Sequence, residues 1–251
     1  MIKKANSERM AFLMKDTVKL GAGVRMIAHR GVSGLERENT NAAFVAAGNR
    51  SYYGVETDVH RTADGQFIII HDDTTDRVAG IGCTVEETDF DTLRALRMTD
   101  LEGNPRGDLM FPSLAEYIII CKKYGKEAVL ELKNHFEPKD IEAIIAIIRE
   151  IGWLKRTIFI SFDLPNMLCI REKLPEQRAQ YLVCEFGDDL LDILTKNHLD
   201  LDIHYKAISA EQVKACHEAG IVVNVWTVDD PAEGERLAGY GVDYITSNIL
   251  E

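Results

Sequence analysis

The chain has 251 residues and a formal net charge of −12 at pH 7. Nucleic acids and anionic membrane surfaces repel such a charge, so the composition argues against both as partners. Hydrophobic residues make up 46% of the chain, enough to bury a full core, and no run approaches the roughly 20 apolar residues of a membrane-spanning helix. Five scattered cysteines without a C-x-x-C motif indicate a reduced, cytoplasmic protein.

The first predicted elements lie between residues 1 and 48. The apolar run over residues 10–14 indicates a short helix in an N-terminal extension over residues 1–23, which would cover one end of the domain or meet a second subunit of a homo-oligomer. A strand beginning near residue 26 delivers His29 and Arg30 at its end. Asn39 and Thr40 then cap a predicted helix over residues 41–48.

Residues 54–72 predict a β-hairpin that carries charged side chains. Glu56 and Asp58 are two residues apart on a β-branched run, so both side chains point to one face. The Asp-Gly pair at 64–65, between two alternating runs, is a strong hairpin signal. Pairing residue 63 with residue 66 would place His71 opposite Asp58, and a one-residue change of register would move it. The hairpin therefore predicts two carboxylates and a histidine in one patch.

The remaining chain predicts a regular alternation of strands and helices. Residues 73–111 are irregular, with one helix expected over 90–98 and little core, and indicate a small insertion. From residue 112 strands alternate with helices, which is typical of βαβ units and a parallel sheet.

Apart from the return arm of the hairpin, eight strands are expected to begin near residues 26, 54, 128, 157, 180, 199, 221 and 242. Eight such units predict an α/β fold, a (β/α)8 TIM barrel with a β-hairpin after the second strand, in one domain over residues 1–251. A doubly wound open sheet is the alternative, but no glycine-rich phosphate turn follows the first strand.

Polar residues recur at the predicted C-terminal ends of the strands, where barrels carry their active sites. They are His29, Arg30, Glu56, Asp58, Glu131, Lys133 and Trp226. Three inward-facing carboxylates would repel each other unless a cation lay between them. Carboxylate oxygens without cysteine suit Mg²⁺ or Ca²⁺ rather than zinc. For an acidic pair such as Glu56 and Asp58 taken alone, the competing interpretation is a solvated face of the strand.

Five runs occur in order from about residue 27 to the end of the chain: IAHRG, ENTNAAF, GVETDVHRTADGQFIIIHDDT, ELK and VNVWTV. Together they resemble the glycerophosphodiester phosphodiesterase family. The resemblance implies a (β/α)8 barrel with a small insertion after the histidine-aspartate pair. It also implies that Glu56, Asp58 and Glu131 bind a divalent metal.

The resemblance further implies which groups act on the substrate. His29 and His71 map to the general acid and base, and Arg30 and Lys133 map to positions that contact the phosphate. The implied activity is metal-dependent hydrolysis of a small glycerophosphodiester to an alcohol and glycerol 3-phosphate. Two alternatives stay open: a related barrel phospholipase acting on lysophospholipids or phosphoinositides, and a catalytically silent phosphate-binding barrel.

Other residues near the strand ends have less defined roles. Phe162 and Trp226 are candidates for an apolar wall beside the glycerol or alcohol moiety, with packing at the barrel rim equally open. His60 is in phase with Glu56 and Asp58, and we expect it to be a bystander.

Two positions depart from the family pattern. Arg37 replaces a proline that usually precedes the Glu-Asn-Thr run. Ser247 and Asn248 follow the last threonine, where the family commonly has an aspartate. Neither touches the metal or acid/base set, so we expect both to affect substrate preference.

Overall fold

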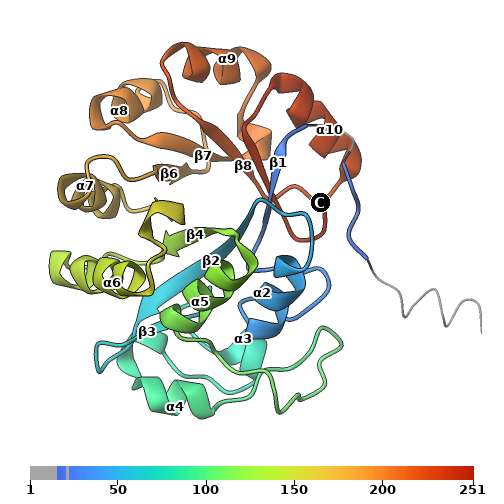
Figure 1. Ribbon diagram of the computed structural model, residues 1–251, viewed down its shortest axis with the longest axis vertical. Coiled ribbons are helices and arrows are strands. Elements are labelled where there is room, and N and C mark those ends of the chain that lie inside the picture. Colours follow the sequence, from blue (N-terminus) through green and yellow to red (C-terminus); the bar gives the residue numbers. More distant parts are fainter. Residues whose placement is uncertain (1–15, 21–22) are drawn as a thin grey trace, which may run out of the picture.

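The computed structural model describes residues 16–20 and 23–251. Within them, eight parallel strands form a closed barrel, because β1 pairs with both β2 and β9. The strands are β1 (Arg25–Ala28), β2 (Gly54–Arg61), β4 (Glu127–Leu132), β5 (Thr157–Ser161), β6 (Ala179–Val183), β7 (Asp200–His204), β8 (Val223–Trp226) and β9 (Tyr244–Ser247). Helices surround them (Figure 1). The predicted (β/α)8 barrel is confirmed, with each strand starting within two residues of the expected position.

The helices begin and end where local sequence signals place them. Ser113 and Ser209 form capping boxes at the starts of two helices, and Pro138 opens a third. The helices around the barrel are α2 (Asn41–Gly48), α5 (Leu114–Tyr124), α6 (Pro138–Ile151), α7 (Leu164–Lys173), α8 (Leu190–Asn197), α9 (Ala210–Glu218) and α10 (Pro231–Tyr240), with short 3₁₀ turns η2 (Leu154–Arg156) and η3 (Tyr205–Ala207). None of the helices in the described part of the chain is long and apolar enough to cross a membrane.

The return arm of the hairpin is β3 (Phe67–Ile69), which pairs antiparallel with β2. Residues 59, 60 and 61 lie opposite residues 69, 68 and 67. The expected pairing of residue 63 with residue 66 was therefore wrong by one position. Ile70 rather than His71 lies opposite Asp58, and the Ile70 N–H donates to the Asp58 carbonyl oxygen at 3.1 Å.

The register differs because the turn contains three residues. The Thr62 N–H donates to the Gln66 carbonyl oxygen at 2.9 Å, which closes the loop one residue earlier than a two-residue turn would. Gly65 adopts φ +81°, the left-handed conformation that such a loop requires. The Thr62 hydroxyl fixes the loop, since it accepts from the Gln66 N–H at 3.0 Å and donates to Asp64 Oδ1 at 2.6 Å. His71 therefore lies just beyond the last paired residue.

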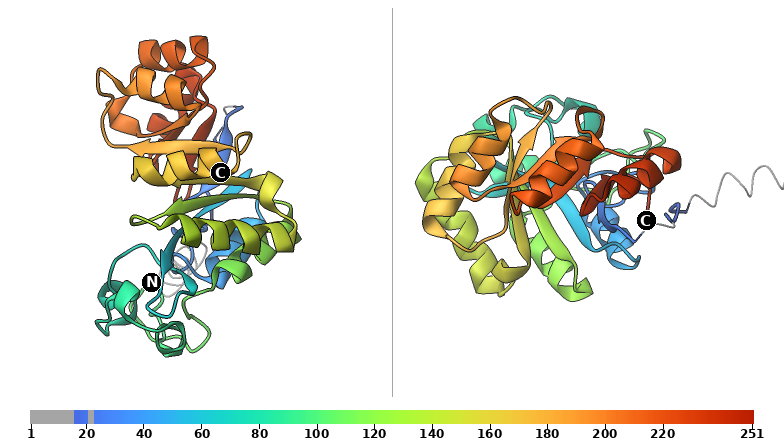
Figure 2. Two further views of the ribbon diagram at one scale, coloured as in Figure 1. Left: turned by 90° about the vertical axis from the view of Figure 1, so that its left-hand side faces the viewer. Right: turned by 90° about the horizontal axis from the view of Figure 1, so that it is seen from above.

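The insertion over residues 73–111 contains α3 (Asp76–Ala79), the 3₁₀ turn η1 (Val85–Glu87) and α4 (Phe90–Ala95). Figure 2 shows it projecting at one side of the barrel, beside the β2–β3 hairpin. The expectation of little core was wrong, because the insertion and the hairpin share a buried cluster: Ile68, Ile70, Val78, Val85, Leu93, Met98, Leu109 and Phe111.

Helix α4 of the insertion is shorter than the helix expected over residues 90–98. Met98 has left the helix, and its N–H bonds to the Leu109 carbonyl oxygen at 3.0 Å. Backbone pairing across the insertion thus replaces the last helical turn.

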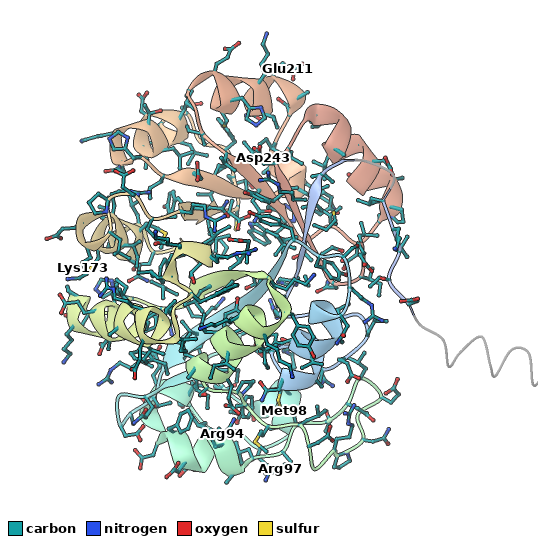
Figure 3. All side chains as sticks on the ribbon, viewed as in Figure 1. Arg94, Arg97, Met98, Lys173, Glu211 and Asp243 are labelled. Carbon is teal, nitrogen blue, oxygen red and sulfur yellow. The ribbon has the colours of Figure 1, made fainter. Side chains whose placement is uncertain are left out.

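The main core lies between the strands and the surrounding helices, where side chains fill the space (Figure 3). Phe44 of α2 and Tyr117 of α5 make an edge-to-face contact there, with ring centroids 5.0 Å apart. The expected helix over residues 10–14 lies outside the described residues. Further along, the Val18 N–H donates to the Ile249 carbonyl oxygen at 3.0 Å, so the chain beside β1 is joined to the segment after β9.

Candidate active site

Three buried carboxyl groups meet inside the C-terminal end of the barrel. Glu56 and Asp58 lie on β2, and Glu131 lies on β4 as the register partner of Asp58. The three are at most 7% exposed, and one oxygen of each lies within 4.8 Å of the others. The two-residue spacing on β2 and the parallel pairing of β2 with β4 together produce this convergence.

The electrostatics of the cluster are unfavourable without a further cation. Burial, with the charges of Asp58 and Glu131, raises the pKa of Glu56 well above its usual range. Burial and the Asp58 charge raise the pKa of Glu131 to about 8. Burial also acts to raise the pKa of Asp58, but Arg30 and Lys133 outweigh it and hold that pKa below its usual range. Of the three acids, Asp58 is therefore the one whose ionised form the neighbouring basic residues favour.

The donor set fits a hard divalent cation. All three groups offer carboxylate oxygens, the ligand type that Mg²⁺ and Ca²⁺ prefer. Asp58 Oδ1 is buried without a hydrogen-bond partner, so it has capacity left for another ligand. A divalent cation at this point would offset the mutual repulsion of Glu56, Asp58 and Glu131.

Two basic residues lie against the carboxyl cluster. Arg30 follows β1, and its backbone N–H donates to Glu56 Oε2 at 2.8 Å while its Nε lies 3.5 Å from Asp58 Oδ2. Lys133 follows β4, with its Nζ 2.8 Å from Glu131 Oε1 and 3.6 Å from Asp58 Oδ1. Both residues predicted to contact the phosphate therefore lie beside the predicted metal ligands.

A network around Asn248 fixes the orientation of His29. The Asn248 side-chain N–H donates to Asp229 Oδ2 at 2.6 Å, which turns Asn248 Oδ1 toward His29 Nδ1, 2.7 Å away. Nδ1 must then carry the proton, which leaves Nε2 as the acceptor, 3.9 Å from Glu56 Oε2. Burial and the nearby Arg30 lower the pKa of His29 to about 4, which favours the neutral imidazole.

His71 is held by a carboxylate instead. Its Nδ1 donates to Asp72 Oδ1 at 2.7 Å, and Asp72 accepts from Arg77 of α3 at 2.6 Å. Arg77 also donates to Glu38 at 2.7 Å, and Glu38 accepts from Arg30 at 2.8 Å. The insertion therefore supplies a link between the two sides of the site. Burial lowers the pKa of His71 below its usual value, while Asp58 and Asp72 act in the opposite direction.

A third partner of Asp58, besides Arg30 and Lys133, comes from the loop after β1. Asn39 donates from Nδ2 to Asp58 Oδ2 at 2.7 Å and accepts from the Thr57 hydroxyl at 2.7 Å. Asn39 is buried and adopts φ +54°. This loop residue thus orients a predicted metal ligand, a role that the sequence interpretation did not assign to it.

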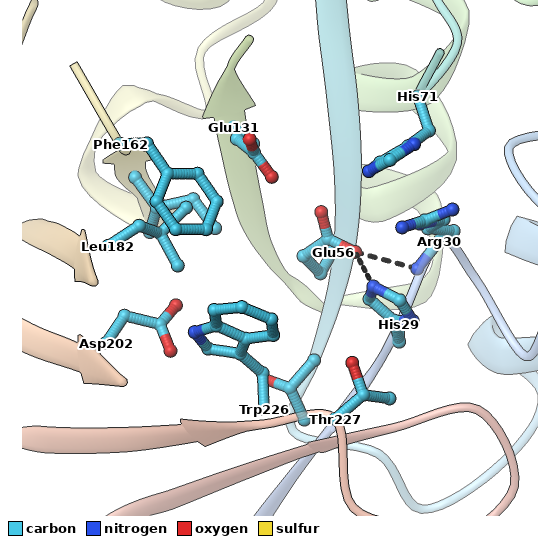
Figure 4. A pocket seen from close by; sticks show the side chains of 12 residues that line it. His29, Arg30, Glu56, His71, Glu131, Phe162, Leu182, Asp202, Trp226 and Thr227 are labelled. Carbon is cyan, nitrogen blue, oxygen red and sulfur yellow. Dashed lines mark hydrogen bonds and ion pairs between the residues drawn. The ribbon is translucent and has the colours of Figure 1, made fainter. Parts of the chain in front are cut away.

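These groups surround a cavity with about 430 Å³ of empty space (Figure 4). Its lining residues are His29, Arg30, Glu56, His71, Glu131, Ile160, Phe162, Leu182, Asp202, Trp226, Thr227 and Thr246. Phe162 and Trp226 form one wall as an edge-to-face pair with ring centroids 5.6 Å apart. Asp58 and Lys133 are not among the lining residues and lie behind Glu56 and Glu131.

His60 does not line the cavity. It is fully buried, with Nδ1 3.2 Å from Glu86 Oε1 and Nε2 3.4 Å from the His71 carbonyl oxygen. It therefore contacts the insertion and the backbone of His71 rather than the space that a substrate would occupy.

Sequence reasoning missed several members of the site. Asn248 was identified only as a departure from a pattern, yet it contacts His29, and Asp229 supplies a carboxylate behind it. Asp202 on β7 was not singled out at all. Its only signal was the alternation of Asp200 and Asp202 along one strand, which is also typical of a solvated face.

Comparisons with known proteins agree with this arrangement. A family model described as the glycerophosphoryl diester phosphodiesterase family matches residues 29–250. The chain is 28% identical to a glycerophosphodiester phosphodiesterase of Caldanaerobacter subterraneus subsp. tengcongensis, over 90% of this chain and 94% of that protein. It is 32% identical to glycerophosphodiester phosphodiesterase 1 of Mus musculus, over 91% of this chain and 79% of that protein.

Solved structures include a similar barrel with a bound product. It is an Oleispira antarctica phosphodiesterase in complex with the product sn-glycerol-3-phosphate, which superimposes with a TM-score of 0.82 at 27% identity. The match covers 90% of this chain and 93% of that one.

Proposed function

This chain belongs to the glycerophosphoryl diester phosphodiesterase family and is a phosphoric diester hydrolase, and we propose that it hydrolyses glycerophosphodiesters to an alcohol and glycerol 3-phosphate with a divalent cation. The observation that carries this proposal is a cluster of three buried carboxyl groups, two of which line the same cavity as His29 and His71. The product bound to the Oleispira antarctica relative supports glycerol 3-phosphate as the product here.

Glu56, Asp58 and Glu131 would hold the cation, Mg²⁺ or Ca²⁺. When bound, such an ion polarises a phosphoryl oxygen and offsets the negative charge that develops in the transition state. Arg30 adds positive charge at the cavity wall, and Lys133 adds it behind Glu131 and Asp58. Both would favour the phosphate of an anionic substrate in a chain with a net charge of −12.

His29 is assigned as the general base. Its Nδ1–H is engaged by the Asn248 amide oxygen, so the Nε2 lone pair is directed into the site and can accept the proton of the attacking hydroxyl group. That hydroxyl belongs either to water or to the glycerol carbon beside the one that carries the phosphate ester. Its oxygen forms a new bond to phosphorus as the proton moves to His29. In the second case a cyclic phosphate forms, and water must open it to give glycerol 3-phosphate.

His71 is assigned as the general acid. The Asp72 carboxylate accepts its Nδ1–H and stabilises the imidazolium form, whereas the Asn248 amide that accepts from His29 carries no charge. As the bond between phosphorus and the leaving oxygen breaks, His71 Nε2 would protonate that alkoxide. The different partners of the two histidines thus support the division of roles.

The test is release of glycerol 3-phosphate from glycerophosphocholine. We expect turnover with Mg²⁺ or Ca²⁺, its loss with a chelator, and its recovery when metal is restored. A panel of glycerophosphodiesters with different headgroups extends the assay. Absence of turnover across the panel with both metals would contradict the proposal, and binding without turnover would favour a catalytically silent barrel.

A further inference from the structure

On the cavity wall across from His29 and His71, two buried polar atoms have no hydrogen-bond partner. They are Oδ1 of Asp202 on β7 and Nε1 of Trp226 on β8. Asp202 is only 2% exposed, and both residues line the cavity. Figure 4 shows the Asp202 carboxyl group on the side of the cavity where the Trp226 indole nitrogen lies, across from His29 and His71.

Other polar groups inside this part of the barrel are satisfied within the protein. The Thr246 hydroxyl donates to Asn224 Oδ1 at 3.2 Å, and the Asn224 amide donates to Gln180 at 3.5 Å. Asp200, on the same strand as Asp202, accepts from the Val222 N–H at 3.0 Å. Asn224 also forms a hydrogen bond to the Asp202 carboxyl group, but Oδ1 of Asp202 is left without a partner. An unpaired buried polar atom costs free energy, so this oxygen has capacity for a partner from outside the protein.

The Asp202 side chain is suited to a neutral hydroxyl group. Among the described residues no basic side chain forms an ion pair with it, and burial together with the Glu131 charge raises its pKa well above the usual range. In either protonation state, a carboxyl oxygen can accept a hydrogen bond from a hydroxyl group. The surrounding wall is apolar, formed by Ile160 and Leu182 in addition to the aromatic pair.

We propose that Asp202 and Trp226 Nε1 form a hydroxyl-recognition subsite that binds the glycerol moiety of the substrate. A single alcohol group satisfies both atoms, because it can accept from the indole N–H and donate to the carboxyl oxygen. An apolar pocket with a few convergent polar groups is the usual arrangement for orienting a small ligand. The inference rests on the proposed function, since that function places a glycerol phosphate in this cavity.

The position of the subsite assigns it to glycerol rather than to the headgroup. Asp202 and Leu182 are 2% and 4% exposed, whereas Phe162 on the same wall is 41% exposed. The three-carbon moiety common to all glycerophosphodiesters fits the enclosed end, and headgroups of different size extend past Phe162 toward solvent. Asp202 is therefore a specificity-determining residue: a substrate without the hydroxyl leaves two buried polar atoms unpaired.

The test is calorimetric binding of two phosphates in the presence of Mg²⁺: sn-glycerol 3-phosphate, and propyl phosphate, which has the same carbon chain without hydroxyl groups. We expect the unmodified protein to prefer glycerol 3-phosphate by about tenfold to a hundredfold, the value of one or two hydrogen bonds to buried groups. Asp202→Ala should bind the two phosphates nearly equally, with its affinity for propyl phosphate changed by less than about threefold.

Two further variants separate hydroxyl recognition from effects on the fold. Trp226→Phe removes the N–H and keeps an aromatic ring, and it should lose part of the preference. Asp200→Asn lies on the same strand outside the cavity lining and should keep the full preference. Thermal unfolding of each variant verifies that it is folded before its affinities are compared.

Either of two results would overturn the inference. One is an unchanged ratio of affinities in both Asp202→Ala and Trp226→Phe, and the other is equal weakening of the two phosphates. Because binding is measured without turnover, the inference and the proposed function can fail separately. A protein that keeps an Asp202-dependent preference but hydrolyses no glycerophosphodiester would refute only the proposed function.

Discussion

Buried glutamates at the two ends of the barrel differ in their basic partners, as Glu127 and Glu131 on β4 illustrate. Glu127, at the N-terminal end of the strand, accepts from Arg156 Nε at 2.5 Å and also pairs with Arg178. Glu131, four residues later on the same side of the strand, has Lys133 as its only basic partner among the described residues, and its pKa is raised to about 8. Two arginines thus balance the charge of Glu127, whereas a single lysine lies beside Glu131 in its cluster of three carboxyl groups.

The same contrast holds on β1. Arg25, its first residue, lies over the rings of Tyr53 and Tyr244, 5.0 and 5.7 Å from their centroids. His29 and Arg30, just beyond its last residue, meet carboxyl groups that crowd one another. We therefore expect the N-terminal end to contribute stability, and under the proposed function the unbalanced charge at the C-terminal end would serve a metal and a substrate. Four substitutions test this division.

The largest effect on activity should come from His71→Ala. Loss of the general acid should lower kcat by about a thousandfold, while metal binding at Glu56, Asp58 and Glu131 persists. Steady-state kinetics and metal titration measure the two properties. His217→Ala is a matched control, because His217 also pairs with an aspartate, Asp243 at 3.0 Å, but lies on α9 away from the cavity. An unchanged rate in His71→Ala would remove it from the acid role.

Glu131→Gln should lower kcat/KM by about a hundredfold and raise the metal concentration needed for half-maximal activity. The amide keeps the volume of the side chain but removes one of three crowded carboxyl groups. Its free energy of unfolding in chelator should therefore not fall. Urea unfolding and a metal titration measure both. Full activity at low metal would show that the cation binds elsewhere.

Glu127→Gln should have the opposite effect to Glu131→Gln: it should lower stability and leave activity nearly unchanged. Arg156 and Arg178 lose their carboxylate partner, which should lower the free energy of unfolding by about 2 kcal/mol, less than for a fully buried pair because both arginines are partly exposed. Turnover should stay within about twofold of the unmodified protein. A large loss of activity without loss of stability would contradict the division between the two ends.

A smaller loss of activity than in His71→Ala or Glu131→Gln should come from Arg77→Ala, which breaks the link from α3 to Asp72 and Glu38. We expect kcat to fall about tenfold, because Asp72 would hold His71 less firmly, with little change in unfolding temperature, since Arg77 is largely exposed. Arg106→Ala is the control: Arg106 also lies in the insertion and pairs with two acids, but these are Glu36 and Asp108. Equal effects of both variants would indicate a general effect of the insertion.

Much of the barrel could be predicted from the sequence because its signals are local. The βα rhythm located every strand, and the spacing of Glu56 and Asp58 gave their common face. The hairpin register failed by one residue because it depends on the Thr62 side chain, which favours a three-residue loop over the turn that Asp-Gly alone indicates.

The missed site residues depend on contacts between distant segments. Asn248 reaches His29 across 219 positions of sequence, and Asp229 acts on it from the loop after β8. Asp202 becomes distinctive only when its neighbours are seen to be satisfied and its Oδ1 is not. Hydrogen bonding of this kind has no periodic signature along the chain.

The contact between His29 and Asn248 also has a consequence for folding kinetics. The hairpin that positions His71 near Asp58 is local, and its loop closes at small entropic cost. His29 acquires its orienting partner only when β1 meets β9, the pairing with the largest sequence separation in the barrel. Contacts of this range form slowly. We therefore expect a refolding chain to regain its helices and the β2–β3 hairpin before the contact between His29 and Asn248, with turnover as the last property to return.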